Sequence, residues 1–159
     1  MDWNKEFNDA AIYGDFNQVK TIVEKHPDCI NQKDEYGFTV LHDLAGEEQY
    51  EILQFLIDHG ANVNEKNDNG ITPLHLAAWP EIVEILGKNG ADLEAKSNNG
   101  DTPLISLSAE QESEDVMEAL LKAGAQVHAR NNSGKSALDI AIRREESRKI
   151  RVLKKYGAE

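Results

Sequence analysis

The stretch Asp68–Ala78 (DNGITPLHLAA) decides the fold, because its residues encode a tight turn followed directly by a helix. Asn69 and Gly70 suit the turn, since both residue types tolerate a positive φ. Thr72 can cap a helix with its hydroxyl, and Pro73 fits the first helical position, where a missing N–H breaks no hydrogen bond. The apolar residues that follow lie at helical spacing. The stretch therefore predicts a turn that leads into a short helix.

Related stretches occur before and after this one, at regular intervals. The turn glycines stand at positions 37, 70, 100 and 134, so that successive copies are 33, 30 and 34 residues apart. Glycine-alanine pairs that begin at positions 60, 90, 124 and 157 form a second series with the same kind of spacing. A period of this length is typical of repeat proteins, in which each helical unit buries its apolar face against its neighbours.

The period near 33 residues and the Thr-Pro-Leu-His core resemble the ankyrin repeat, and the resemblance covers about residues 5–158. It implies an all-α ankyrin-repeat solenoid of stacked helix-turn-helix units with short β-hairpin loops. It also implies that the hairpin tips and first helices line a concave face that binds other proteins. Small free-standing proteins of this kind look bacterial. The sequence departs from the family pattern at Val40 and Ala137, which replace proline, and at Ile105 and Asp139, which replace histidine.

We expect a single domain over residues 1–159, with repeats at 3–33, 34–66, 67–96, 97–130 and 131–159, of which the first and last are caps. The third repeat lacks three residues beside Trp79-Pro80, because only 8 positions separate Leu74 from Ile82 where 11 separate the equivalent residues of the second repeat. A shortened first helix and a cut corner should result. In the last repeat Lys149 takes the place that Ile82 holds in the third. We expect it to make the outer face of a C-terminal cap polar.

The charge of the chain is strongly negative and unevenly distributed. The net charge is −12, and residues 143–159 carry seven basic and three acidic side chains, so the first 142 residues carry −16. This surface should repel nucleic acid and anionic membranes and attract a basic protein. The alternative is that the acidity only keeps an elongated monomer soluble. With Cys29 as the lone cysteine, no spanning apolar run and no apolar segment behind the N-terminus, a cytoplasmic protein is expected.

Two short motifs imitate ligand sites and fail on spacing. Gly134-Lys135-Ser136 matches the end of a phosphate-binding loop, but Ala129 stands where that loop needs another glycine. Residues 65–70 resemble a calcium loop up to its glycine, yet Leu76 replaces the bidentate glutamate that would follow. We therefore expect neither a nucleotide nor a calcium ion as a cofactor.

The titratable residues likewise lack a catalytic pattern. His42 and His75 are 33 residues apart and have no carboxylate or thiol at ligand spacing, so each ring is expected to bridge backbone groups of adjacent turns. The carboxylate-rich runs look solvated, whereas a general acid needs a carboxyl group in an apolar pocket. The sequence thus predicts neither an enzyme nor a metal site.

The remaining signal lies in residues at repeat positions that point out of the fold. Aromatic and apolar side chains ringed by charge are the usual centre of a protein interface. The alternative is that Phe38 and Trp79 fold back onto neighbouring loops. The predicted partner-binding residues are Tyr13, Glu35, Tyr36, Phe38, Asp43, Glu47, Asp68, Asn69, Ile71, Trp79, Asn99, Asp101 and Arg143.

These features lead to two hypotheses about function. In the first, the chain is a stand-alone inhibitor or regulator that clamps a basic protein through its concave face. The resemblance implies one specific role of this kind, that of an immunity protein that neutralises a toxin. In the second, it is a scaffold that joins one protein at the acidic concave face and another at the basic last helix.

Overall fold

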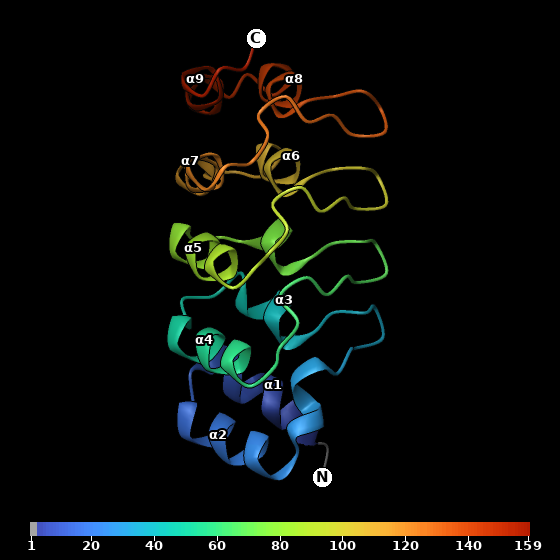
Figure 1. Ribbon diagram of the computed structural model, residues 1–159, viewed down its shortest axis with the longest axis vertical. Helices are drawn as coiled ribbons and strands as arrows, with labels where there is room; N and C mark the ends of the chain where they lie inside the picture. Colours follow the sequence, from blue (N-terminus) through green and yellow to red (C-terminus); the bar gives the residue numbers. More distant parts are fainter. Residues whose placement is uncertain (1–2) are drawn as a thin grey trace.

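The computed structural model describes residues 3–159, so the first two residues of the predicted domain lie outside it. The chain forms a solenoid in which the repeats follow one another along the long axis (Figure 1). The first helices of the repeats are α1 (Trp3–Tyr13), α3 (Val40–Leu44), η2 (Pro73–Leu76), α6 (Pro103–Ser108) and α8 (Ala137–Arg143). The second helices are α2 (Phe16–Lys25), α4 (Tyr50–Asp58), α5 (Pro80–Lys88), α7 (Glu114–Ala123) and α9 (Ser147–Lys155), while the 3₁₀ helix η1 (Pro27–Asn31) precedes the first hairpin.

The hairpin loops lie on the opposite side of the solenoid from the second helices (Figure 1). They are turns rather than the predicted β-hairpins, because no β-strand forms anywhere in residues 3–159. Each is closed across five residues, as where the N–H of Asn67 donates to the carbonyl of Ile71 (3.0 Å). Consecutive tips are also joined, since the N–H of Asp68 donates to the carbonyl of Tyr36 (3.1 Å). The loops are thus too short for strands but are fixed in register with one another.

The core runs without interruption along the solenoid between its two rows of helices. Leucines from both rows, such as Leu44, Leu56, Leu74 and Leu86, are completely buried in it. The expected irregularity of the third repeat is confirmed, because η2 is a single 3₁₀ turn of four residues and Pro80 then opens α5. The three missing residues leave no room for another turn of the first helix.

The two repeat histidines bridge adjacent hairpins, as predicted. Nδ1 of His42 accepts the N–H of Thr39 (3.0 Å), which leaves the proton on Nε2 to donate to the carbonyl of Ile71 (3.0 Å). His75 makes the same pair of contacts one repeat later, with Asp101 providing the carbonyl (3.0 Å). Burial lowers the pKa of both rings, so they are neutral connectors.

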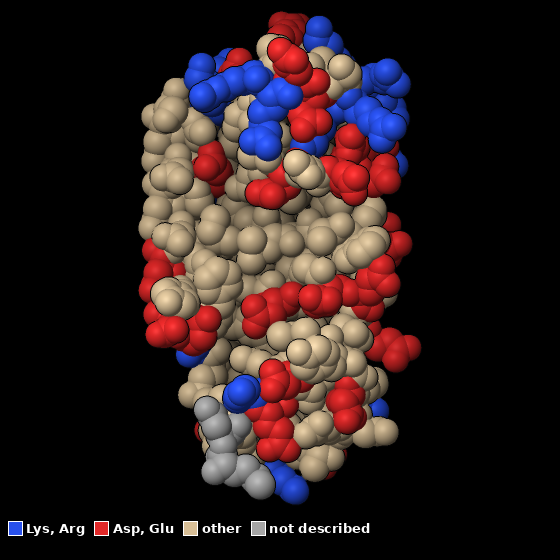
Figure 2. All heavy atoms as spheres, turned by 180° about the vertical axis from the view of Figure 1, so that it is seen from behind, with Lys and Arg blue, Asp and Glu red and all other residues tan. Residues whose placement is uncertain are grey.

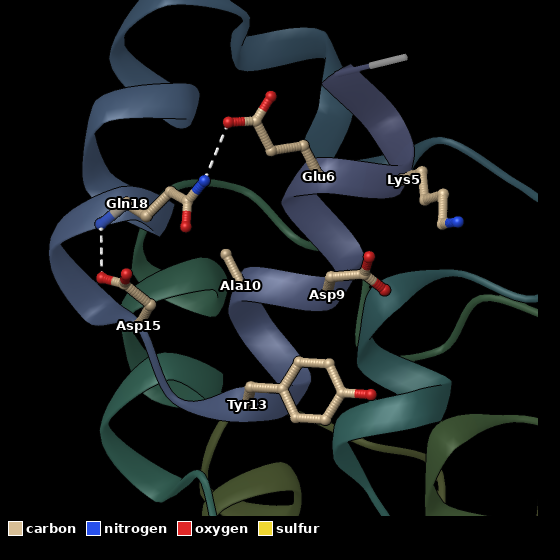
Figure 3. Close-up of a pocket in the computed structure, with 7 residues that line it drawn as sticks. All are labelled: Lys5, Glu6, Asp9, Ala10, Tyr13, Asp15 and Gln18. Carbon is tan, nitrogen blue, oxygen red and sulfur yellow. Dashed lines mark hydrogen bonds between the residues drawn. The ribbon is translucent and has the colours of Figure 1, made fainter. Parts of the chain in front are cut away.

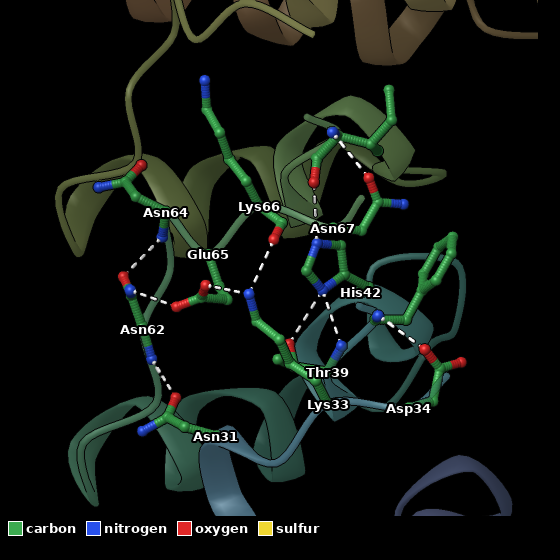
Figure 4. A network of polar contacts seen from close by, with 12 residues as sticks. Asn31, Lys33, Asp34, Thr39, His42, Asn62, Asn64, Glu65, Lys66 and Asn67 are labelled. Carbon is green, nitrogen blue, oxygen red and sulfur yellow. Dashed lines mark hydrogen bonds and ion pairs between the residues drawn. The ribbon is translucent and has the colours of Figure 1, made fainter. Parts of the chain in front are cut away.

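Lysines form a second set of connections between repeats (Figure 4). Nζ of Lys33 donates to the carbonyl of Lys66 (3.0 Å) and pairs with the carboxylate of Glu65 (2.7 Å). Lys66 in turn donates to the carbonyl of Lys96 (2.8 Å), and Lys96 to that of Arg130 (3.4 Å). The hydrogen bond from Lys33 holds the pKa of Glu65 below its ordinary value. Each of the first three repeats is therefore joined to the next by a lysine at the same repeat position.

The prediction that Lys149 makes the outer face of the C-terminal cap polar is wrong. Its side chain is 0% exposed, its ammonium donates to the carbonyl of Glu110, and the carboxylate of Glu146 lies 4.0 Å away. The reason is the longer connection between α6 and α7, which brings a backbone carbonyl over the start of α9. The aliphatic stem fills the place of the isoleucine found in other repeats, and the ammonium reaches that carbonyl.

Candidate partner-binding surface

The first helices present one residue per repeat at an equivalent position, which changes character along the solenoid. That position holds Asp9, Asp43, Leu76, Ser106 and Ile140 in order. Two carboxylates are thus followed by the apolar Leu76, the small polar Ser106 and the apolar Ile140. The back of the molecule shows a comparable division, with a broad band free of charged side chains between groups of carboxylates and with Lys and Arg gathered at the C-terminal end (Figure 2).

Asp43 is a carboxylate of this surface whose charged form is disfavoured by its surroundings. It belongs to α3, is half-buried, and no donor within residues 3–159 is hydrogen-bonded to its carboxylate. Burial raises its pKa, and the nearby negative charges of Asp34 and Glu47 raise it further. Because a desolvated carboxylate beside like charges is unfavourable, this side chain would gain from an approaching cation.

Tyr13 ends α1 beside a shallow pocket between α1 and α2 (Figure 3). Its side chain is 82% exposed, and Asp9 lies one helical turn before it on α1. Within the same pocket Glu6 accepts a hydrogen bond from the amide of Gln18 (2.8 Å), while Asp15 caps α2. An exposed ring next to carboxylates is suited to a cationic side chain.

The apolar part of the surface lies on the hairpins and the third repeat. Tyr36 is 62% exposed, and Leu76 and Trp79 are each 37% exposed. Phe38 is half-buried, with its ring packed edge-on against that of His42 at 5.5 Å between centroids. The predicted aromatic residues therefore divide between accessible side chains and one that folds back onto its own repeat.

The polar residues predicted on the hairpins also differ in their availability. Asp101 is half-buried and its carboxylate accepts a hydrogen bond from the amide of Asn131 (2.8 Å), so it holds two hairpins together. Ile71 is half-buried as well, its N–H donates to the side-chain oxygen of Asn67 (2.9 Å), and its carbonyl accepts from His42. Exposed side chains are found at Glu35, Glu47, Asp68, Asn69 and Asn99.

Arg143 stands apart from these residues. It is exposed at the end of α8 in the last repeat, whereas Tyr13 belongs to the first. The predicted set therefore extends over the length of the solenoid and is not gathered at one point. Asp9 and Leu76 were missed as candidates, although their equivalence to Asp43 could have been read from the repeat alignment.

Residues 3–159 contain no group of three or more His, Cys, Asp or Glu side chains placed to hold a metal ion. None of the helices between Trp3 and the C-terminus is long and apolar enough to cross a membrane.

Comparison with known proteins identifies the same kind of repeat as the structure. Residues 7–97 and 80–159 match a family model described as ankyrin repeats (3 copies). The chain is 37% identical over 68 residues to alpha-latrocrustotoxin-Lt1a of Latrodectus tredecimguttatus, 43% over 70 to RelA-associated inhibitor of Mus musculus, and 38% over 66 to ankyrin repeat and MYND domain-containing protein 1 of Mus musculus. These segments are 43%, 44% and 42% of the chain but only 5%, 8% and 7% of those proteins. The repeats, the hairpin contacts and the family match together make this chain a member of the ankyrin-repeat family, whose repeats bind other proteins.

Proposed function

We propose that this chain is a non-catalytic inhibitor or regulator that binds a basic protein through its concave face. The observation that carries the proposal is Asp43, a half-buried carboxylate with a raised pKa and two acidic neighbours. A side chain that is unfavourable in the free protein is expected where a partner supplies the missing cation. Neutralisation of a toxin as an immunity protein is one specific form of this function. A cytoplasmic monomer in the free state fits the proposal.

The apolar and acidic parts of the surface have different roles in this proposal. Trp79 and Leu76 would form the buried centre of the interface, because large apolar side chains contribute most of the binding energy when water is excluded around them. Asp9, Asp43 and Glu47 would attract the partner and set its orientation, since charges at an interface rim act mainly on the association rate. One relative is named RelA-associated inhibitor, and this supports a regulatory role for a related stretch.

Affinity capture from the native cell extract tests the proposal, with the tagged protein and the double variant Asp43→Lys/Trp79→Ala. Glu24→Lys is the matched control, because Glu24 is an exposed carboxylate on the second helix α2. A basic protein that the wild type and the control retain, and that the double variant loses, would support the proposal. Partners that remain with the double variant would show that the concave face is not the binding site.

A scaffold that joins two proteins is the second candidate, favoured by the separation of charge. The exposed Arg143, Arg144, Arg148 and Arg151 lie in the last repeat, away from the acidic residues of α1 and α3. This function requires two proteins to bind at once. A ternary complex in size-exclusion chromatography, lost on substitution at either end, would support it over the inhibitor.

A further inference from the structure

Aromatic side chains also gather on the opposite side of the solenoid, on the second helices of the first two repeats. Phe16 begins α2, and Tyr50 and Phe55 belong to α4; all three are half-buried. The rings of Phe16 and Phe55 meet edge to face at 5.3 Å, and His59 packs on Phe55 at 4.0 Å between centroids. The second helices α5 and α7 carry no aromatic residue. The cluster is therefore a local feature and not a property of every repeat.

These rings form the floor of an open groove that continues onto the third repeat. Ile85 of α5 extends the floor, and Glu51, Gln54 and Asp58 of α4 line its side. The amide of Asn89 donates to Gln54 (3.3 Å), and Gln54 donates to Asp58 (2.8 Å). This chain of hydrogen bonds fixes the polar wall of the groove. An apolar floor with an ordered polar edge is typical of an interface.

The charges around the groove are mostly negative. Glu48 and Glu51 lie beside Tyr50, whose pKa is raised first by burial and then by the charges of Glu81 and Glu48. The basic residue at the groove is Lys20, whose ammonium lies 4.0 Å from the centre of the Phe16 ring. The ring face thus already attracts one cation, and the carboxylates of the rim can attract others.

We infer that this groove docks an amphipathic helix of a protein partner, with apolar residues on one face and lysine or arginine beside them. Neighbouring packed helices lie about 8–10 Å apart, and residues i and i+7 of a helix are about 10.5 Å apart along its axis. Apolar side chains at this spacing can contact α4 and α5 together. The basic residues of the occupant would face Glu51 and Asp58.

A second copy of this chain is a poorer occupant, although its helix α9 is basic. The residues of α9 that could fill an apolar floor are used in its own fold, where Leu153 and the stem of Lys149 are completely buried. Its exposed side chains include Arg148, Arg151 and Lys154, which are all cationic. Such a face matches the rim of the groove but not its floor.

A synthetic helical peptide tests the inference, with leucines at i, i+3, i+4 and i+7 and flanking lysines. It is titrated into the ¹⁵N-labelled full chain and followed by NMR, beside a scrambled peptide without an apolar face and a peptide with glutamate for lysine. We expect shifts confined to α2, α4 and α5. Phe55→Ala and the exposed-rim variant Glu51→Lys/Asp58→Lys should each raise Kd at least about tenfold, and Asp28→Lys should change it less than about twofold.

The other outcomes would overturn the inference. These are failure of the peptide to bind, equal binding of the scrambled or the acidic peptide, or shifts centred on the hairpins. Concentration-dependent dimers of the free chain that Glu51→Lys/Asp58→Lys abolishes would assign the groove to a second copy instead. The rim variant changes only exposed side chains, and an unchanged thermal midpoint would separate its effect from misfolding. The variant Asp43→Lys/Trp79→Ala should bind the peptide normally, which distinguishes this groove from the concave face.

Discussion

His42 and Asp43 are neighbours in α3 whose pKa values are displaced in opposite directions by the same cause. Burial disfavours whichever form is charged, so it lowers the pKa of the imidazole and raises that of the carboxyl group. His42 meets this constraint by staying neutral and joining two hairpins. Asp43 gains no such compensation within its own repeat. At the scale of single residues, stability and binding therefore make different demands on adjacent positions.

Replacing Asp43 with asparagine should stabilise the free protein at neutral pH while weakening its complex. A raised folded pKa means that the favourable contribution of this group exists below its unfolded pKa of 3.8 and is lost as the pH rises through the folded value. Removing the charge should raise the free energy of unfolding at pH 7 by about 0.5 kcal/mol. Urea denaturation of both proteins measures this. A less stable variant would contradict the assigned role.

The buried histidines should make the protein less stable in mild acid. Because their folded pKa values are lowered, the unfolded chain takes up protons first as the pH falls through 6.5. Stability is therefore complete above that pH and declines below it, toward the folded pKa. His42→Gln should cost roughly 1–3 kcal/mol at pH 7.5 and show a shallower decline between about pH 6.5 and 5.5. Urea midpoints across this range provide the test, and parallel curves would exclude His42 as the group that titrates.

At the scale of elements, the second helices provide the packing that holds consecutive repeats together. Leu56 of α4 is 0% exposed within the continuous core. Leu56→Ala should lower the free energy of unfolding by roughly 2–5 kcal/mol, because it removes transfer energy and leaves a cavity. Glu51→Ala on the exposed side of the same helix should change it by less than about 0.5 kcal/mol. Denaturant titration compares the two, and equal effects would mean that the helix faces are assigned wrongly.

Lys149 should control the corner between α6 and α7 through its contact with Glu110. Lys149→Met keeps an aliphatic side chain of similar volume, so it should change stability by less than about 1.5 kcal/mol. Lys149→Ala leaves a cavity and should cost roughly 2–4 kcal/mol. Both variants should speed hydrogen exchange in residues 109–113, since the carbonyl loses its donor. Unchanged exchange in Lys149→Met would show that the ammonium does not order this corner.

The elements also show how far the sequence could predict the structure. The short η2 followed from counting residues between Leu74 and Ile82, because a three-residue loss has only the helix end and the corner to affect. The burial of Lys149 did not follow, since it depends on the path of a connection from the preceding repeat. The accessibility of Asp101 likewise depends on Asn131 of the next hairpin, and that of Phe38 depends on how its ring packs against His42 in the same repeat. Local patterns thus predicted the elements, whereas tertiary contacts decided which candidate side chains remained available.

At the scale of the whole molecule, the net charge of −12 should make salt act oppositely on stability and on binding. The folded chain holds its carboxylates close together, and screening weakens their repulsion. The thermal midpoint of the free protein should therefore rise as NaCl increases from about 0.05 to 0.5 M. Association with a basic partner should slow over the same range, because steering is lost. Calorimetry and stopped-flow mixing measure the two effects, and faster association at high salt would argue against an electrostatic interface.

The lysine connections of the solenoid have a consequence for how such a chain can evolve. Lys33, Lys66 and Lys96 each reach the backbone carbonyl at the matching position of the following repeat. A backbone carbonyl is present whatever the side chain, so a duplicated copy of residues 34–66 would find a donor before it and an acceptor after it. Tandem duplication in the gene can therefore lengthen the protein while it keeps the same lysine contact between neighbouring repeats. Natural selection can then act on the tips and grooves of the added copy alone.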